Sequence, residues 1–288
     1  MRLQTDPTSH DLDATRQSWN VATRNHNRHK GDQVAFFRAG GDVLFPEELE
    51  LLGALDGLEV AHLQCNGGQD TLGLARRGAI VTGVDLSDVA IAFARTLSEG
   101  AGVSARFVEA DVVRWLHTTP ERFDLLFTSY GAVGWLPDLT AWAEGVARVL
   151  RDGGRLVYVD FHPLVWSVGD DLRLSRDDYF ATDPFVEPVA DYVAASGAAL
   201  GVVTPAASEP NPVAAQSWQY GLGQIVSAVA AAGLRIEVLR EYPHSNGCRV
   251  NPALVEGPDR TWRWPDGAAR VPLMFGLVAC AKASDRVK

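Results

Sequence analysis

Short apolar segments alternate with amphipathic ones from residue 58 onward, and this rhythm constrains the fold more than any other feature of the sequence. Each apolar segment has the length of one strand, and turn or capping residues follow it before the next helical pattern begins. Strands that alternate with helices predict an α/β fold with a mostly parallel sheet and helices on both faces. The strand candidates are Leu58–Leu63, Ala79–Val84, Ala105–Val108, Phe123–Thr128 and Arg155–Phe161.

The helices around these strands have recognisable boundaries. Pro46 followed by two glutamates starts a helix, because proline fits the first turn and acids favour its positive end. The helix after the first strand ends at Gly78, Ser87 caps a helix over Asp88–Ser98, and another helix covers Ala141–Leu150. The pattern breaks after residue 163 and resumes with a helix over Ser217–Ala232, then with strands over Leu234–Tyr242 and Val271–Ala281. We therefore expect seven strands in one sheet.

The net charge excludes several classes of partner. The chain has 36 acidic and 26 basic residues and a formal charge of −10. Nucleic acid and anionic membranes both need a basic face, so we expect neither as a partner. Three cysteines without metal-ligand spacing predict neither a disulfide framework nor a metal site. The polar amino-terminal segment has no apolar core of signal-peptide length, and we expect a cytoplasmic protein.

The most informative stretch is the turn after the first strand, which carries Gly67 and Gly68 and opens a helix. In an open parallel sheet, ligands bind at the carboxyl ends of the strands. Asp85 closes the second strand, where a carboxylate can accept hydrogen bonds from both hydroxyls of a ribose. The alternative for Asp85 is a helix cap. Asp111 ends the third strand, where it could hold an adenine amino group or be a simple loop residue.

The nucleotide need not be a dinucleotide. The turn lacks the G-x-G-x-x-G spacing that a pyrophosphate needs, which argues against a nicotinamide-dependent oxidoreductase. Asp70 also places a negative charge where a diphosphate would sit. A ligand with ribose and adenine but no phosphate fits better, and S-adenosylmethionine has that composition.

At this point the sequence resembles the class I S-adenosylmethionine-dependent methyltransferases, over residues 19–282. It is most similar to small-molecule methyltransferases of bacterial specialised metabolism, such as the lincosamide N-methyltransferases. The motifs that carry the resemblance are HLQCNGGQD at 62–70, VTGVD at 81–85, ADV at 110–112, FTSYG at 127–131, WLPD at 135–138 and FHP at 161–163.

The resemblance implies a Rossmann-like fold whose last strand is antiparallel, and S-adenosylmethionine as the cofactor. The methionine part of the cofactor would contact the turn at 64–68. Its ribose would contact Asp85 at the end of the second strand, and its adenine would contact Asp111 at the end of the third. Its sulfonium would lie near the end of the fourth strand, beside Trp19. One departure matters: His62 stands where the family usually has an acid, so the partner of the methionine ammonium is not identified. The cofactor-binding candidates are Trp19, Gln64, Cys65, Asn66, Gly68, Asp85, Leu86, Asp111, Val112, Ser129 and Tyr130.

Methyl transfer depends mostly on positioning, and an acceptor that loses a proton also needs a base. His162 follows the fifth strand at the edge where substrates bind, although a structural hydrogen bond is the alternative. His26 lies in a segment that folds over the cofactor in related enzymes. We take His162, His26 and Tyr130 as the catalytic candidates. His29, His244 and Tyr220 are weaker ones.

One domain is expected. It would comprise a helical lid over 1–55, a cofactor-binding core over 56–163, a substrate-covering insertion over 164–214 and the rest of the sheet over 215–288. The lid, the insertion and Trp262 with Trp264 would form the substrate chamber, with Trp166, Tyr179, Phe180 and Trp218 as aromatic residues.

The sequence thus predicts a methyltransferase that acts on a small molecule, with an amine of a specialised metabolite favoured as acceptor. C- or O-methylation of an aromatic or indole-type molecule is one alternative, and a non-catalytic S-adenosylhomocysteine-binding protein is another. We expect no bound metal, and we expect the protein to form a homo-oligomer.

Overall fold

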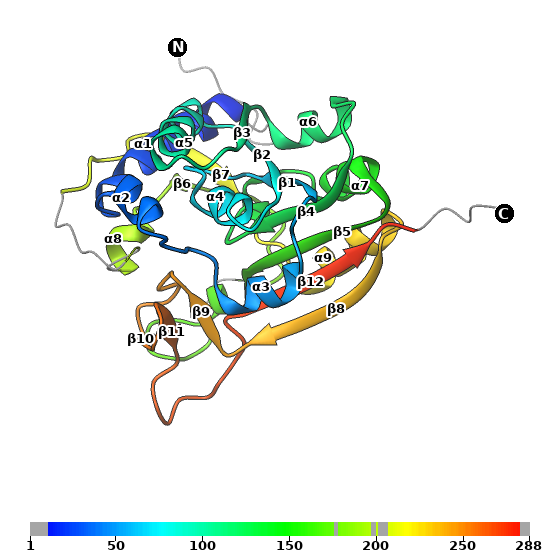
Figure 1. The fold of residues 1–288 in the computed structure, drawn as a ribbon. Coiled ribbons are helices and arrows are strands. Elements are labelled where there is room, and N and C mark those ends of the chain that lie inside the picture. Colours follow the sequence, from blue (N-terminus) through cyan, green and yellow to red (C-terminus); the bar gives the residue numbers. More distant parts are fainter. Residues whose placement is uncertain (1–10, 176–177, 197–199, 201–206, 283–288) are drawn as a thin grey trace, which may run out of the picture.

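The computed structural model describes residues 11–175, 178–196, 200 and 207–282. Its centre is a seven-stranded sheet with the order β3-β2-β1-β4-β5-β12-β8 (Figure 1). The first five strands are parallel to their neighbours, and β12 is antiparallel to both β5 and β8. The expected fold is confirmed, including the antiparallel last strand. The strands are β1 (Glu59–Leu63), β2 (Ile80–Asp85), β3 (Arg106–Glu109), β4 (Phe123–Ser129), β5 (Leu150–Phe161), β8 (Arg235–Tyr242) and β12 (Met274–Cys280).

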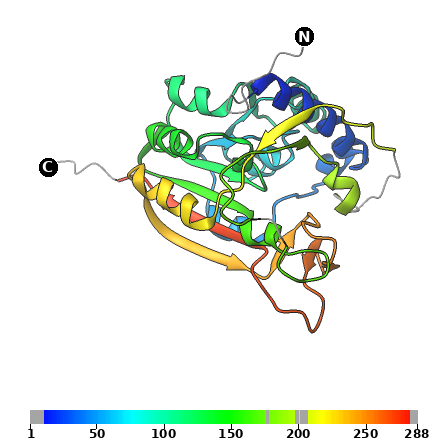
Figure 2. The ribbon, with the colours of Figure 1, turned by 180° about the vertical axis from the view of Figure 1, so that it is seen from behind.

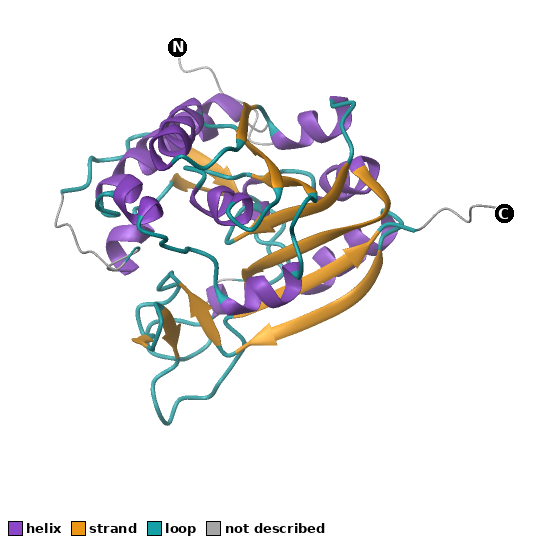
Figure 3. Cartoon of the chain, viewed as in Figure 1, coloured by secondary structure: helices purple, strands orange, loops and turns teal. Residues whose placement is uncertain are grey.

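Helices cover both faces of this sheet (Figure 3). One apolar cluster joins the sheet to α6 (Val112–Thr118), α7 (Leu139–Val149) and α9 (Leu222–Ala231). Figure 2 shows these three helices from behind. The other cluster joins it to α3 (Pro46–Leu52), α4 (Gln69–Ala75) and α5 (Asp88–Ala101).

Strand β5 shows how the sequence builds two cores from one strand. Leu156 and Tyr158 pack into the cluster of α6, α7 and α9, whereas Val157 and Val159 pack into the opposite one. All four side chains are buried, because successive residues of a strand point to opposite faces and both faces carry helices.

The amino-terminal helices and the segment after β5 lie together at the edge where β1, β2 and β4 end. Helices α1 (Leu12–Arg28) and α2 (Gln33–Arg38) begin at Asp11 and Asp32, whose side chains accept backbone hydrogen bonds as N-caps. The segment after β5 contains β6 (Phe185–Pro188), α8 (Tyr192–Ser196) and β7 (Ala214–Ser217), and β6 pairs with β7.

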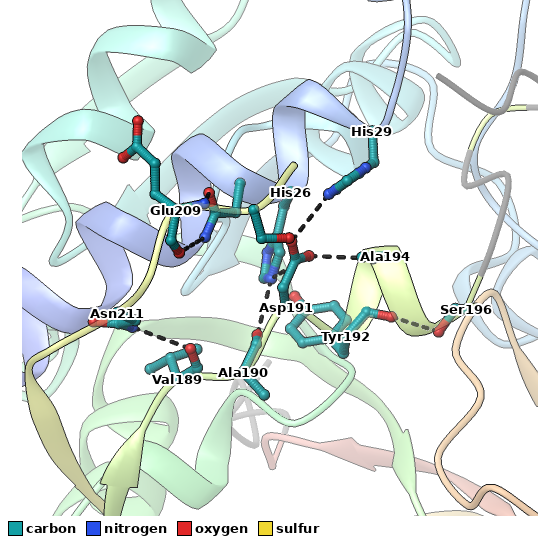
Figure 4. Close-up of polar contacts among 12 residues, drawn as sticks. His26, His29, Val189, Ala190, Asp191, Tyr192, Ala194, Ser196, Glu209 and Asn211 are labelled. Carbon is teal, nitrogen blue, oxygen red and sulfur yellow. Dashed lines mark hydrogen bonds and ion pairs between the residues drawn. The ribbon is translucent and has the colours of Figure 1, made fainter. Parts of the chain in front are cut away.

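Polar contacts fasten α1 to this segment (Figure 4). The Asn25 side chain donates to the Glu209 carbonyl and accepts from the Glu209 amide, both at 2.8 Å. His29 Nε2 lies 3.0 Å from the Asp191 carboxylate. Asn211 Nδ2 donates to the Ser18 carbonyl of α1 at 3.1 Å and also to the Val189 carbonyl at 3.1 Å. We call the contacts of Asn25, His29 and Ser18 the α1 clasp, since they join α1 to residues 191, 209 and 211.

The excursion between β8 and β12 forms a small sheet of its own, with β11 (Thr261–Arg263) between β10 (Val255–Glu256) and β9 (His244–Asn246). Trp264 is buried in the apolar cluster beside this sheet, and its indole N–H donates to the Val271 carbonyl at 2.9 Å. Two further single-turn helices are η1 (Val133–Trp135) and η2 (Pro163–Ser167).

Three local expectations were wrong. Residues 112–118 form α6, although the sequence suggested no helix there. Residue 217 belongs to β7, and the helix expected from it starts at Leu222, after a Gly221 N-cap. The fifth strand begins at Leu150 instead of Arg155, because its first residue pairs with Phe123.

We expect Asn25→Ala to lower the free energy of unfolding by about 1–2 kcal/mol, because it removes two hydrogen bonds between the buried Asn25 side chain and the partly buried backbone of Glu209. Chemical denaturation would measure this change. Arg24→Ala is the matched control, since Arg24 makes only an exposed ion pair with the same Glu209 at 3.6 Å. Equal losses in the two variants would contradict a stabilising role for the α1 clasp.

Candidate active site

A cavity of about 850 Å³ opens at the carboxyl ends of β1, β2 and β4. Its walls come from the turns after these strands, from α1 and α8, and from the excursion after β8. Ten of the thirteen residues proposed for the site from the sequence line this cavity: Trp19, Gln64, Cys65, Asn66, Asp85, Leu86, Asp111, Val112, Ser129 and Tyr130.

The turn after β1 takes an unusual backbone course. Gln64, Asn66 and Gly68 have φ angles of 53°, 45° and 78°, all in the left-handed region that favours glycine. Gln64 Nε2 donates to the Ala132 carbonyl at 2.6 Å, and its Oε1 is buried with no partner among the described residues. The turn therefore carries an unpartnered acceptor atom on a residue that lines the cavity.

Asp85 anchors this turn. Its carboxylate accepts from the Asn66 amide and from the Ser87 amide, each at 2.8 Å. Burial raises its pKa to about 6, although these two hydrogen bonds work in the opposite direction. The cap of α5 is Ser87, whose hydroxyl accepts from the Ala90 amide at 3.0 Å. Asp85 is therefore not the cap residue of that helix.

Asp111 is a helix cap and not a simple loop residue, and its adenine-binding role stays a prediction. Its carboxylate accepts from the Arg114 amide at 2.7 Å as the N-cap of α6, and it also lines the cavity beside Val112. Trp19 packs edge to face on Trp135, with ring centroids 5.3 Å apart, and both rings line the cavity.

The turn after β4 places Tyr130 in the cavity wall. Its φ of 49° is left-handed. The turn is held because the Tyr130 amide donates to the Val159 carbonyl at 3.0 Å and the Gly131 amide donates to the Asp160 carboxylate. The Tyr130 ring lies 5.4 Å from that of Phe161, and burial raises the pKa of its hydroxyl well above the usual value. This tyrosine is therefore a neutral hydrogen-bonding group.

His62 cannot replace the missing acid as a charged group. Its Nδ1 lies 2.8 Å from the Thr71 hydroxyl, and burial lowers its pKa to about 3. A carboxylate is present elsewhere in the lining, because Asp70 and His62 line the same cavity. Burial raises the Asp70 pKa, while Lys30 and Arg260 oppose this. Lys30 also lines the cavity, and burial lowers its pKa to about 8.

Three proposed residues do not line the cavity. A Cβ at position 68 would lie 2.8 Å from Ala94 Cβ and from Phe107, so close packing requires glycine at this position. His26 is buried behind Tyr192, with its Nε2 at 3.1 Å from the Ala190 carbonyl, and burial lowers its pKa to about 4 (Figure 4). His162 caps η2 and lies 3.0 Å from the Glu241 carboxylate. Their placement does not favour His26 or His162 as the base, and their roles stay predictions.

The weaker base candidates are also engaged elsewhere. His29 contacts Asp191, His244 contacts Glu47 at 2.9 Å, and the Tyr220 hydroxyl donates to the Leu136 carbonyl at 2.6 Å.

The expected aromatic chamber is formed only in part. Trp166 and Trp218 line the cavity, with Phe45, Phe161 and Tyr192 as further rings. Phe180 is 78% exposed, and the Tyr179 hydroxyl accepts from the Leu222 amide at 3.0 Å. Trp262 and Trp264 pack in the cluster beside β11. These four aromatic residues lie outside the lining.

The cavity lining also includes Lys30 and Asn246, which were not proposed as site residues from the sequence. Lys30 belongs to a short basic cluster that favoured a solvated helical face over phosphate binding. Asn246 ends a three-residue strand that pairs only within the excursion, so no pattern marks it.

Comparison with known proteins identifies the central part of the chain. Residues 60–154 match the family model described as a methyltransferase domain. This match covers 95 of the 288 residues. It runs from β1 into β5 and includes the turns that hold Asp85, Asp111 and Tyr130.

Two curated relatives match part of the chain. The ubiquinone biosynthesis O-methyltransferase of Alkalilimnicola ehrlichii is 30% identical over 109 residues, which cover 38% of this chain and 44% of that protein. An uncharacterized methyltransferase of Synechocystis sp. is 34% identical over 143 residues, or 46% of this chain and 62% of that protein. The matched segments thus span less than two thirds of either relative.

Solved structures confirm the class I methyltransferase fold. An S-adenosylmethionine-dependent methyltransferase from Mesorhizobium loti has a TM-score of 0.55 at 20% identity, covering 84% of this chain and 99% of that one. The [4+2]-cyclase SpnF has a TM-score of 0.55 at 15% identity, covering 96% and 97%. At these identities the likeness establishes the fold alone.

The described residues hold neither a membrane-crossing helix nor a cluster of metal-binding side chains. No helix among them has the length and apolarity needed to cross a membrane. They also contain no group of three or more His, Cys, Asp or Glu side chains that could hold a metal ion.

We expect Gly68→Ala to destabilise the domain by about 2–4 kcal/mol, because it combines a left-handed backbone with a buried clash. Denaturant unfolding would measure the loss. The neighbouring Gly67→Ala is the control, since its Cβ would meet chiefly the flexible end of the Gln69 side chain at 3.0 Å. A loss for Gly68→Ala no larger than that for Gly67→Ala would refute this explanation.

Proposed function

We propose that this protein is an S-adenosylmethionine-dependent methyltransferase that acts on a small molecule. The observation that carries the proposal is the cavity at the strand ends, which brings Asp85, Asp111 and the turn at 64–66 together. Carboxylates at the ends of adjacent strands suit ribose hydroxyls and an adenine amino group. When bound, this cofactor supplies an electrophilic methyl group on a sulfonium.

The residues present fit the cofactor. Asp85 would hold the ribose, Asp111 and Val112 the adenine, and Trp19 and Tyr130 would offer aromatic faces that suit a cation. The acid that usually binds the methionine ammonium is absent, but Gln64, whose Oε1 has no partner among the described residues, and Asp70 both line this cavity. We assign the ammonium to these two groups and the methionine carboxylate to Lys30.

A hydroxyl-bearing acceptor fits better than the amine expected from the sequence. The name of the Alkalilimnicola relative describes O-methylation in ubiquinone biosynthesis. The rings of Phe161, Trp166 and Trp218 in the cavity wall would pack against a flat acceptor. We therefore favour a phenol-like small molecule. A specialised metabolite as the acceptor, a homo-oligomeric state and a cytoplasmic location stay predictions.

The second candidate function is non-catalytic binding of S-adenosylhomocysteine. The fold does not separate the two, because a protein described as a [4+2]-cyclase also has it. Transfer of a labelled methyl group to any member of a panel of phenols, amines and indoles would establish catalysis. Binding of both cofactor forms without any transfer to the panel would favour the non-catalytic function.

We expect Asp85→Ala to weaken S-adenosylhomocysteine binding by about 1.5–3 kcal/mol, the contribution of hydrogen bonds to a charged acceptor. Isothermal titration calorimetry would measure the affinity. Asp88→Ala is the matched control, since Asp88 lies at the start of α5, contacts Arg16 and Asn20, and does not line the cavity. An unchanged affinity in Asp85→Ala would show that this carboxylate does not bind the ribose.

We also expect S-adenosylhomocysteine affinity to fall as the pH drops below 6. The pKa of Asp85 is raised to about 6, so its carboxylate is ionised above that value and protonated below it. If binding requires the ionised form, affinity at pH 5 is about tenfold lower than at pH 7. In Asp85→Asn this dependence should disappear, and its persistence there would assign the effect to another group.

A further inference from the structure

A buried polar cluster lies behind the cavity wall at Tyr130. It joins Glu48 of α3, Tyr130 after β4 and Asn246 at the end of β9. Asn246 Nδ2 lies 3.3 Å from the Tyr130 hydroxyl and 3.2 Å from a Glu47 carboxylate oxygen. Residues from three distant parts of the chain therefore meet at one point of the cavity, and Tyr130 and Asn246 both line it.

Glu48 is the buried acid of this cluster. Its side chain is 1% exposed, and Oε2 accepts from the Phe45 amide at 2.8 Å, which caps α3. The other oxygen, Oε1, has no partner of full hydrogen-bond geometry among the described residues, and the carboxyl group interacts with the Tyr130 hydroxyl. The cap thus uses one oxygen and leaves the other for the tyrosine.

The charges around Glu48 make it a weak acid. Burial raises its pKa to about 8, and the neighbouring Asp70 and Glu47 carboxylates contribute to the rise. The hydrogen bonds from Tyr130 and the Phe45 amide act in the other direction. Groups with a pKa near the working pH are the most effective proton acceptors.

Asn246 holds Tyr130 in place and carries a second unpaired acceptor atom of this cluster. The residue is 2% exposed, and its Oδ1 has no partner among the described residues. Its orientation follows from Glu47, because a carboxylate requires the N–H₂ side of the amide. An unpaired buried oxygen costs free energy unless a ligand donates to it.

From this arrangement we propose that the Tyr130 hydroxyl oxygen accepts the hydrogen bond of the methyl acceptor's hydroxyl, that Asn246 Nδ2 holds this tyrosine in place, and that Glu48 receives the proton through Tyr130. This inference rests on the proposed function. As the acceptor O–H becomes O–CH₃ and the sulfonium becomes a thioether, one proton must leave the acceptor oxygen. Tyr130 takes that proton while it passes its own to Glu48 Oε1, so the charge balances with Glu48 neutral.

Proton release on cofactor binding tests Glu48 without knowledge of the acceptor. At pH 7.5 the Glu48 carboxyl is mostly protonated, and a sulfonium beside Tyr130 favours its ionised form. Calorimetry in buffers of different ionisation enthalpy should therefore show that S-adenosylmethionine releases a fraction of a proton more than neutral S-adenosylhomocysteine does. Glu48→Gln, which keeps the helix cap, should abolish most of this difference and leave the affinity for S-adenosylhomocysteine unchanged.

Glu50→Gln is the matched control for this experiment. Glu50 lies on the same helix but forms an exposed ion pair with Arg240. We expect it to retain the full difference in proton release. Equal release by the two cofactor forms in the unmodified protein, or an unaltered difference in Glu48→Gln, would overturn the assignment of Glu48.

Turnover of catechol, or of any other phenol that accepts a methyl group, gives a second readout. The rate should rise with pH toward an inflection at or below 8, because the acceptor state of Glu48 is its carboxylate. Glu48→Gln and Tyr130→Phe should lower kcat about 100-fold or more, with little change in KM for the cofactor, and remove this inflection. An unchanged pH profile in Glu48→Gln would refute the proton transfer, whereas a protein that binds neither cofactor form would instead refute the proposed function.

Discussion

The Asp85 carboxylate is the interaction on which the candidate site depends. It accepts hydrogen bonds from the amides of Asn66 and Ser87, so it joins the turn after β1 to the turn after β2 before any ligand is present. The left-handed residues Gln64 and Asn66 need such support, because side chains rarely adopt this backbone conformation without compensation. A single buried acid thus shapes the loop and faces the cavity that the loop lines.

The sequence predicted the sheet well because its signals are local. Buried strands such as β5 read as continuous apolar runs, and their helices have caps such as Ser87. Helix α6 was missed because its seven residues are too few to show a period, although Asp111 is its cap. The acids at strand ends were found for the same local reason, since each directly follows an apolar run.

The acceptor side of the cavity could not be predicted in this way. Asn246 and Glu48 are about two hundred positions apart, and their meeting at Tyr130 depends on how the excursion after β8 folds back over α3. His162 was favoured because it follows a strand at the right edge, but its ring turns to Glu241 instead of the cavity. Position at a strand end sets where a residue starts, and tertiary packing decides which way its side chain points.

The cofactor side and the acceptor side of the cavity differ in how much of each the family model covers. The family model ends at residue 154, so it covers the turns proposed to hold the cofactor and leaves out α1, the segment after β5 and the excursion. Those outer parts supply most of the walls around Tyr130. The family model therefore informs the cofactor side more than the choice of acceptor.

The α1 clasp has a consequence for the order of folding. Asn25 is synthesised early, but its partner Glu209 follows 184 residues later, after most of the sheet has left the ribosome. Closing so long a loop is entropically costly and is favoured only once the intervening elements are compact. The sheet and its strand-end turns can therefore assemble first, and the outer wall of the cavity closes last. Damage to the clasp should leave a protein with a formed central sheet and an open chamber.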